Sequence, residues 1–247
     1  MFSFPGYGVK KSKADPPPTR MSAKVDSQGP DFRSIKNIRE REEAFVAFLS
    51  PFIQEANKQV AKQRKKFRKL YKKHSHHKKL NRKHSRWLKS LADSYGLGNA
   101  SLLEPATWKE LSGRVDIVPE SLVLAQAALE SDWGQSRFAR EGNNFFGHHC
   151  NRPGCGIIPL RRAEGATYEV ECYPSPLDSV RRYIHNINTH AAYERLRTIR
   201  EEERAKGKKP DGYALAEGLS LYSELGNGYI PILQAMIREH KWGHFDK

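Results

Sequence analysis

The chain has 247 residues, of which 38% are hydrophobic, and it carries a formal net charge of +15. Its length allows one or two domains, and no segment approaches the roughly 18 consecutive apolar residues that a membrane-spanning helix needs. The excess charge is localised, because Lys58 to Lys89 contains 15 of the 43 basic residues and no acidic one. The other basic residues balance the 28 acidic ones, so the rest of the chain is near neutral.

The first segment is rich in Pro, Lys, Ser and Gly and shows no apolar period. Pro16 to Pro18 and Gln28 to Pro30 are typical of extended linker chain, so we expect residues 1–31 to be a disordered linker. The start of the chain also lacks the basic residues and the apolar stretch of a signal peptide.

A helical period begins at Ile38 and places apolar residues such as Phe45, Leu49 and Phe52 on one face. At Ser50 and Pro51 the helix should either kink or restart with a new cap. We expect residues 32–98 to form a basic helical arm packed on the domain that follows. A purely structural interpretation of Lys58 to Lys89 is a solvated helical hairpin. The functional interpretation is electrostatic binding of a polyanion, such as an anionic wall polymer, a lipid surface or nucleic acid.

The next helix is expected to end with a carboxylate. Residues 122–129 are too apolar all round for a surface helix, Pro119 suits the first helical position and Gly134 the residue just past the end. Glu130 would then lie in the last turn, where partial desolvation and the helix C-terminus both raise its pKa. That is what a general acid needs near neutral pH, although a half-buried Glu beside a core Trp would show the same pattern.

Aromatic and amide side chains follow this carboxylate closely. Trp133, Phe145 and Phe146 offer flat apolar faces of the kind that hold sugar rings. Asn143 and Asn144 add amides able to pair with hydroxyl and acetamido groups. We therefore take these five as candidate substrate-binding residues.

Past this motif, residues 150–173 are predicted to form a loop and a small β-hairpin. A helix should begin after Ser175, with Pro176 in its first turn and Asp178 completing a capping pattern. Further helices are predicted over residues 191–206, 211–221 and 229–240.

The three cysteines leave several states open. Cys150 and Cys155 could close a small disulfide loop in an exported protein, or all the thiols could be free. A zinc site that adds His148, His149 and Cys172 is a third alternative, but a single Cys-x4-Cys pair matches zinc knuckles weakly.

The pattern Ala-Leu-Glu-Ser-x-Trp-Gly-x-Ser at residues 128–136, followed by Asn-Asn-Phe-Phe-Gly at 143–147, resembles the signature of bacterial peptidoglycan β-N-acetylglucosaminidases. These are the glucosaminidase domains of flagellar rod-assembly proteins and autolysins. Within this family the chain is most similar to the bacterial Bax-like proteins. The matching features are Arg114 to Pro119, the Cys150 and Cys155 pair, and Asn186 to His190 before Tyr193. Asp132 departs from the pattern, because the family usually has Gly there.

This resemblance implies a mainly α, lysozyme-like fold, in which a helical lobe and a small β-hairpin flank a cleft. The basic arm would precede it, and residues 99–247 would form the glucosaminidase domain. The implied activity is hydrolysis of β-1,4 bonds after N-acetylglucosamine in peptidoglycan glycan strands, without a cofactor or metal. It also implies a periplasmic or cell-envelope location, which conflicts with the missing signal peptide.

The resemblance also assigns catalytic roles. Glu130 would protonate the leaving oxygen. A tyrosine before the last helix of the family is matched by Tyr222, with Tyr229 as the weaker candidate, and we expect Tyr229 to be a further substrate-binding residue. Where the family has a second acid, it lies on the hairpin, and here Glu164, at a glycine-bearing turn, is expected to assist without being indispensable.

Two other functions are compatible with the same residues. A lytic transglycosylase shares the fold and needs only one acid, and its products are anhydro-sugars. A polyanion-binding or wall-binding protein without turnover is the third possibility, which the presence of Glu130 disfavours.

Overall fold

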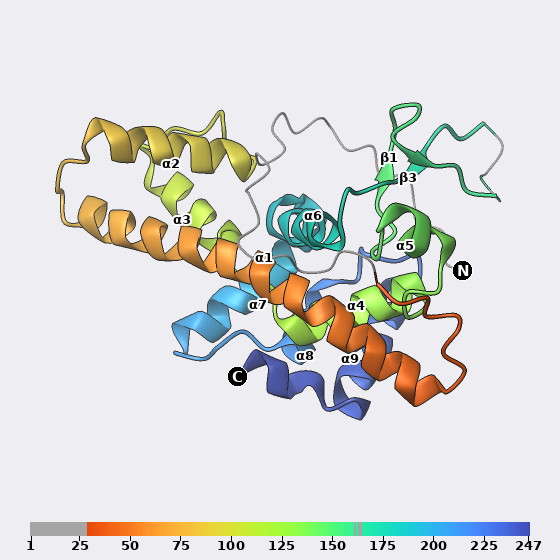
Figure 1. The fold of residues 1–247 in the computed structure, drawn as a ribbon. Coiled ribbons are helices and arrows are strands. Elements are labelled where there is room, and N and C mark those ends of the chain that lie inside the picture. The colour runs from red at the N-terminus through yellow and green to blue at the C-terminus, as the bar shows by residue number, and fades with distance from the viewer. Residues whose placement is uncertain (1–28, 161, 163–164) are drawn as a thin grey trace.

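The computed structural model describes residues 29–160, 162 and 165–247, and the expected linker falls almost wholly outside them. The described chain is mainly helical, with one small three-stranded antiparallel sheet, as a lysozyme-like fold requires (Figure 1). Within the described part of the chain, none of the helices has the length and apolar character needed to span a membrane.

Helix α1 (Ile38–Ser75) is the longest element, and it runs through Pro51 without restarting. Its N-terminus is capped by the side chain of Asn37, which accepts hydrogen bonds from the backbone N–H groups of the first turn. The N-terminal half buries Phe45, Leu49 and Phe52 in the main core. Since tertiary packing holds the helix on both sides of the proline, the lost backbone hydrogen bond does not end it.

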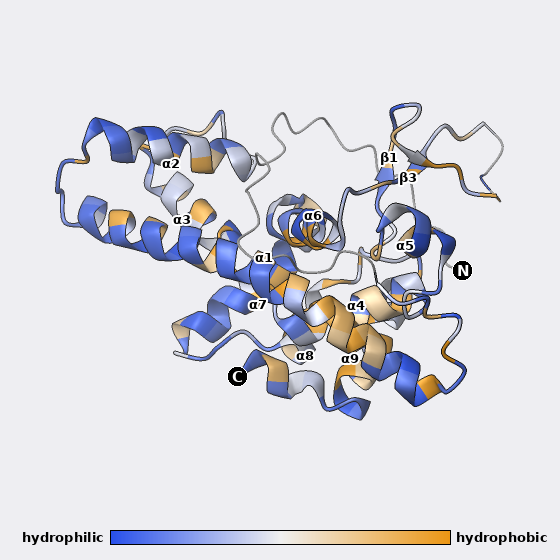
Figure 2. Cartoon of the chain, in the orientation of Figure 1, coloured by the Kyte–Doolittle hydropathy of each residue, from blue (hydrophilic) through white to orange (hydrophobic). Residues whose placement is uncertain are grey.

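Helix α4 (Glu120–Ser131) lies at the centre of the main core and contacts α1, the short helix α8 (Gly212–Leu215), α9 (Tyr229–Glu239) and the 3-10 turn η4 (Trp242–Asp246). Its residues from Glu120 to Ala128 are all buried. The hydropathy colours show the same centre, since hydrophobic residues gather on α4, α9 and the first half of α1 (Figure 2). This confirms the prediction that residues 122–129 form an internal helix.

A second, smaller core joins the C-terminal half of α1 to α2 (Arg82–Ser94) and α3 (Pro105–Arg114). Phe67, Leu88 and Leu111 are fully buried in it. Arg64 strengthens this junction, because its guanidinium donates to the carbonyl oxygens of Ser112 and Val115 and pairs with the buried Asp116. The basic helical arm is therefore held by packing as well as by charge.

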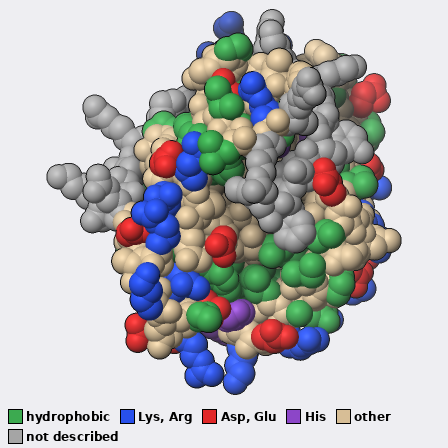
Figure 3. Space-filling view, turned by 90° about the vertical axis from the view of Figure 1, so that its right-hand side faces the viewer, with side chains coloured by type: hydrophobic (Ala, Val, Ile, Leu, Met, Phe, Trp, Pro, Cys, Tyr) green, Lys and Arg blue, Asp and Glu red, His purple; other side chains and the backbone are tan. Residues whose placement is uncertain are grey.

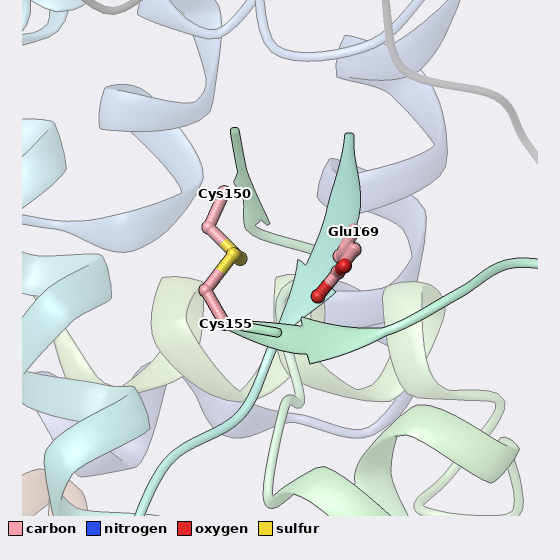
Figure 4. A group of neighbouring side chains, drawn as sticks. All are labelled: Cys150, Cys155 and Glu169. Carbon is pink, nitrogen blue, oxygen red and sulfur yellow. A yellow bond between two sulfur atoms is a disulfide. The ribbon is translucent and has the colours of Figure 1, made fainter. Parts of the chain in front are cut away.

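The sheet has the order β1-β3-β2, with β1 (His149–Cys150) and β2 (Gly156–Ile157) both antiparallel to β3 (Glu169–Glu171). One strand more is present than the expected hairpin. A disulfide joins Cys150 to Cys155 across the β1–β2 loop, which is one of the three cysteine states left open by the sequence (Figure 4). Gly156 is required here, because a Cβ would lie 1.9 Å from the carbonyl oxygen of Val170.

The helices after the sheet mostly follow the predicted ranges. Helix α6 (Pro176–Thr189) begins as expected, with the Ser175 hydroxyl accepting from the Asp178 N–H. The turn η1 (Ala191–Tyr193) leads into α7 (Glu194–Ala205). The helix expected over 211–221 is shorter, since α8 passes into the 3-10 turn η2 (Ala216–Gly218), and η3 (Gly226–Gly228) then leads into α9.

Candidate active site

Glu130 lies in the last turn of α4, as predicted, and the chain turns sharply just after it. Asp132, Trp133 and Gly134 all have positive φ, at 50°, 53° and 77°. The Ser131 hydroxyl holds this turn, donating to the Ala127 carbonyl oxygen at 2.6 Å and accepting from the Gly134 N–H at 2.9 Å. The Glu-Ser-x-Trp-Gly motif is thus a left-handed helix end that fixes the position of the carboxylate.

Glycine is needed at position 134 for a second reason. A Cβ there would lie 2.5 Å from the ring of Phe32, which is itself buried in the main core. The backbone of the motif therefore packs directly against the segment before α1. This contact joins the expected catalytic motif to a residue about a hundred positions earlier in the chain.

The pKa of Glu130 is raised from its ordinary value to about 7, and burial is the larger cause. The hydroxyl of Tyr229 donates a hydrogen bond to Glu130 Oε1 at 2.7 Å, which favours the anion and lowers the pKa in part. The effect of burial on the pKa is larger than the effect of this hydrogen bond. Asp132, which stands where the family usually has Gly, is exposed and is not among the causes of the shift.

A chain of buried hydrogen bonds continues from Tyr229 into the core. The Gln126 amide nitrogen donates to the Tyr229 hydroxyl at 3.2 Å, and the Gln126 amide oxygen accepts from the Tyr183 hydroxyl. Gln126 and Tyr183 have no exposed surface and Tyr229 has 1%. Because each group has a buried partner, the Tyr229 hydroxyl is directed at Glu130.

Tyr222 lies behind Tyr229. The two rings are nearly parallel, with centroids 5.7 Å apart, and the Tyr222 hydroxyl donates to the Phe146 carbonyl oxygen at 3.1 Å. The sequence ranked Tyr222 above Tyr229 as the tyrosine of the site. In the structure, the hydroxyl that bonds Glu130 is that of Tyr229, and Tyr222 packs against the Tyr229 ring.

The segment Asn143 to Gly147 packs next to these tyrosines, and its Phe146 carbonyl oxygen accepts the bond from Tyr222. Asn144 is 1% exposed. Its amide nitrogen donates to the carbonyl oxygens of His148 and Glu171, and its amide oxygen accepts from the N–H groups of Phe146 and His148. The rings of Phe145 and Phe146 are also buried, and Phe146 stacks on Tyr183 with centroids 4.2 Å apart. In this structure the side chains of Asn144, Phe145 and Phe146 are buried, and their contact with sugar stays a prediction.

Asn143 and Trp133 are the half-buried members of the predicted substrate-binding set. Asn143 closes helix α5 (Arg137–Gly142) in a left-handed conformation, and its amide donates to the Tyr173 carbonyl oxygen at 3.0 Å. Trp133 packs edge-on against Phe45 and Trp242. Trp133 and Asn143 are thus only partly buried, and their contact with sugar stays a prediction.

The carboxylates of the sheet have structural partners. Glu169 accepts hydrogen bonds from the N–H groups of Gly154 and Gly156, which holds its pKa below the ordinary value. Glu171 accepts from the Tyr173 hydroxyl at 2.8 Å and lies 3.7 Å from Arg182. Glu164, the expected second group, lies outside the described residues.

Glu169 also lies close to both sulfur atoms of the Cys150–Cys155 pair, a grouping that could suggest a metal site (Figure 4). Zinc sites use thiolates as ligands. Since the two sulfurs are bonded to each other and the carboxylate is bound to backbone N–H groups, this set does not fit a metal ion.

Sequence reasoning missed Gln126 and Tyr183. Gln126 lies four residues before Glu130 and is the one polar side chain between Leu122 and Leu129, so it shares a helix face with the acid. This signal was available. The pairing of Gln126 with Tyr183 and Tyr229 depends on how α6 and α9 pack against α4, which no local pattern predicts.

Comparison with known proteins agrees with this geometry. Residues 105–241 match the family described as Glucosaminidase, mannosyl-glycoprotein endo-beta-N-acetylglucosaminidase. The chain belongs to this glucosaminidase family, which places it among the glycosidases that act on cell-wall glycans. It is also 31% identical over 223 residues to "Protein bax" of Escherichia coli (strain K12), an alignment that covers 90% of this chain and 78% of that protein. No solved structure matched the chain. The family and the Bax-like subgroup recognised from the motif are thus confirmed.

Proposed function

We propose that this protein hydrolyses β-1,4 bonds after N-acetylglucosamine in peptidoglycan glycan strands of the cell envelope, with Glu130 as the general acid. The observation that carries the proposal is the environment of Glu130. Its carboxyl is held at the end of a buried helix, bonded to a tyrosine, with its pKa raised to about 7. A carboxylic acid that keeps its proton close to neutral pH can donate it to a leaving glycosidic oxygen.

Tyr229 has two roles in this proposal. Its hydroxyl fixes the orientation of the Glu130 carboxyl before the reaction. It also stabilises the carboxylate that forms once the proton has left, because a donated hydrogen bond is stronger to an anion than to a neutral acid. Gln126 is a positioning residue, since it contacts the Tyr229 hydroxyl and not the proposed reacting atoms.

The second chemical group is proposed to be the acetamido group of the substrate. Glu169 and Glu171 are bonded to backbone and side-chain donors of the sheet, so neither is free to act as a base without breaking those bonds. Substrate-assisted hydrolysis is an established exception to the two-carboxylate scheme. In it, the acetamido oxygen attacks the anomeric carbon while Glu130 protonates the leaving oxygen, and water later opens the cyclic intermediate. Glu164 would then assist without being indispensable.

A lytic transglycosylase is the second candidate, because the described site offers one well-placed acid and such enzymes need only one. The two reactions differ in their products. Hydrolysis leaves a reducing N-acetylglucosamine end, whereas the lytic reaction leaves an anhydro-sugar.

The test is a digest of purified cell-wall sacculi, with the products identified by mass spectrometry. Glu130→Gln keeps the size of the side chain and its capacity to bond Tyr229, but its amide has no acidic proton to give to the leaving oxygen. Cleavage should therefore be lost while the fold is kept. Asp132→Asn is the matched control, because it removes an exposed carboxylate two residues away. Cleavage by Glu130→Gln within about tenfold of the parent would reject the assignment of the acid.

A further inference from the structure

A row of lysines occupies one face of the C-terminal half of α1. Successive members are separated by four, three, four and three residues, and they are Lys58, Lys62, Lys65, Lys69 and Lys72. This spacing keeps them on one helix face. At 1.5 Å per residue the row is about 21 Å long, with about 5 Å between neighbours. Phe67 and Leu70 lie on the opposite face, buried in the second core.

Most of the charges in this lysine row form no ion pair with a described residue. All five residues are exposed, and Lys58 lies 3.8 Å from Glu55 in an exposed pair. None of the other four forms an ion pair with any described residue. Arg64 is different, because it is bound to backbone carbonyl oxygens and to Asp116. The row therefore contributes little to holding the fold, and its like charges repel one another.

The surroundings of the row disfavour insertion into a bilayer. Described residues 58–95 include no large exposed hydrophobic side chain. A helix that binds a membrane by insertion needs an apolar face at its surface, and the apolar face of α1 is already covered by α2 and α3.

The aromatic residues of the second core and those packed against it are equally unsuited to stacking on bases. Trp108 is 1% exposed and stacks with His74, while Trp87 lies under the ammonium group of Lys66 at 4.0 Å. Proteins that bind single-stranded nucleic acid combine positive charge with open aromatic platforms. The described part of the arm offers the charge without such a platform.

The row also lies at a distance from the sheet. The C-terminal half of α1 and α2 project at the left of Figure 1, whereas the sheet and α5 lie at the right. The face seen from that right-hand side carries charges of both signs around a gathering of hydrophobic side chains (Figure 3). The C-terminal half of α1 and α2 are mostly hydrophilic in this colouring (Figure 2). The positive charge of the protein is thus concentrated at one end.

We propose that the lysine row binds an extended polymer with repeated phosphate groups, by charge alone. Lysine ammonium groups act as mobile point charges, which suit a flexible chain of phosphates better than a single planar group. The proposal does not depend on the glycosidase reaction, because none of the lysines contacts the candidate active site.

The test measures the binding of long-chain inorganic polyphosphate to the full chain at several salt concentrations. The test variant replaces Lys62, Lys65, Lys69 and Lys72 with Gln, which is also a good helix former. The control variant replaces Lys36, Lys206, Lys208 and Lys209 with Gln. These lysines are exposed and lie outside the stretch Lys58 to Lys89, and the two variants have the same net charge. Lys66 and Arg64 are kept because they contact the fold.

The test variant should bind polyphosphate at least about tenfold more weakly at low salt, and the slope of log affinity against log salt should fall by about 3. The control variant should stay close to the parent. Equal losses in both variants would show that only net charge matters and would overturn the proposal, as would parent binding that does not respond to salt. Tighter parent binding to single-stranded DNA of equal charge, or to vesicles with anionic phospholipid, would reject the phosphate polymer in favour of that partner.

Discussion

The elevated pKa of Glu130 makes a quantitative prediction about stability. A carboxyl titrates near 4.5 in the unfolded chain and at about 7 in the folded protein. Because the folded pKa is the higher one, the stabilising contribution of this group is fully present below about pH 4.5. It is lost as the pH rises through 7, where the folded protein must ionise a buried acid.

This difference in pKa corresponds to about 3 kcal/mol, since one pKa unit is worth about 1.4 kcal/mol. Glu130→Gln removes the titrating group and keeps the shape of the side chain. The free energy of unfolding of the variant, relative to the parent, should therefore increase by about 3 kcal/mol between pH 4 and pH 8.

The assay is urea denaturation of both proteins at pH values across this window, with tryptophan fluorescence as the signal. Other titrating groups are shared, so their effects cancel in the difference. Asp132→Asn, at the exposed neighbouring carboxylate, should show no comparable change with pH. A difference between Glu130→Gln and the parent that stays constant within about 0.5 kcal/mol over the whole window would refute the reasoning about burial.

Three further predictions concern single substitutions elsewhere in the chain. Tyr229→Phe removes the hydrogen bond that lowers the pKa of Glu130, so the alkaline limb of the pH–rate profile should move to higher pH. Tyr222→Phe should leave that limb in place, and equal movement in both variants would contradict the assignment. Gly134→Ala should lower the free energy of unfolding, measured by urea denaturation, by about 2–4 kcal/mol, because it combines a positive φ with a clash against a buried ring. Gly154→Ala has a similar φ of 76° but open space around it, so it should lower this free energy by only about 1–2 kcal/mol. Glu164→Gln should reduce sacculus digestion only in part, and a loss as complete as that of Glu130→Gln would make it a true general base.

The local features of the site could be predicted from the sequence. An apolar run followed by a glycine is enough to place Glu130 at a helix end, and Ser175 with Pro176 is enough to start α6. In both cases the determining residues lie within one or two helical turns of each other. The family motif supplied the rest of the expectation about fold class.

The partners of Glu130 could not be predicted in the same way. Tyr229 lies 99 positions away in the chain, and its preference over Tyr222 depends on the direction in which α9 packs on α4. The burial of Phe146 could not be predicted either, because exposed and core aromatics have the same sequence pattern. The continuity of α1 through Pro51 also reflects tertiary packing, which overrides the local preference of proline.

Helix α1 has a consequence for any attempt to divide this protein into fragments. The family match begins at residue 105, yet the first half of α1 supplies one side of the core around α4. A fragment cut at that boundary would expose the apolar surface of α4 that Phe45, Leu49 and Phe52 now cover. Expressed alone, it should aggregate, and addition of a separate peptide spanning α1 should restore solubility. The long helix is thus an integral part of the folding unit that contains Glu130, even though it lies outside the matched segment.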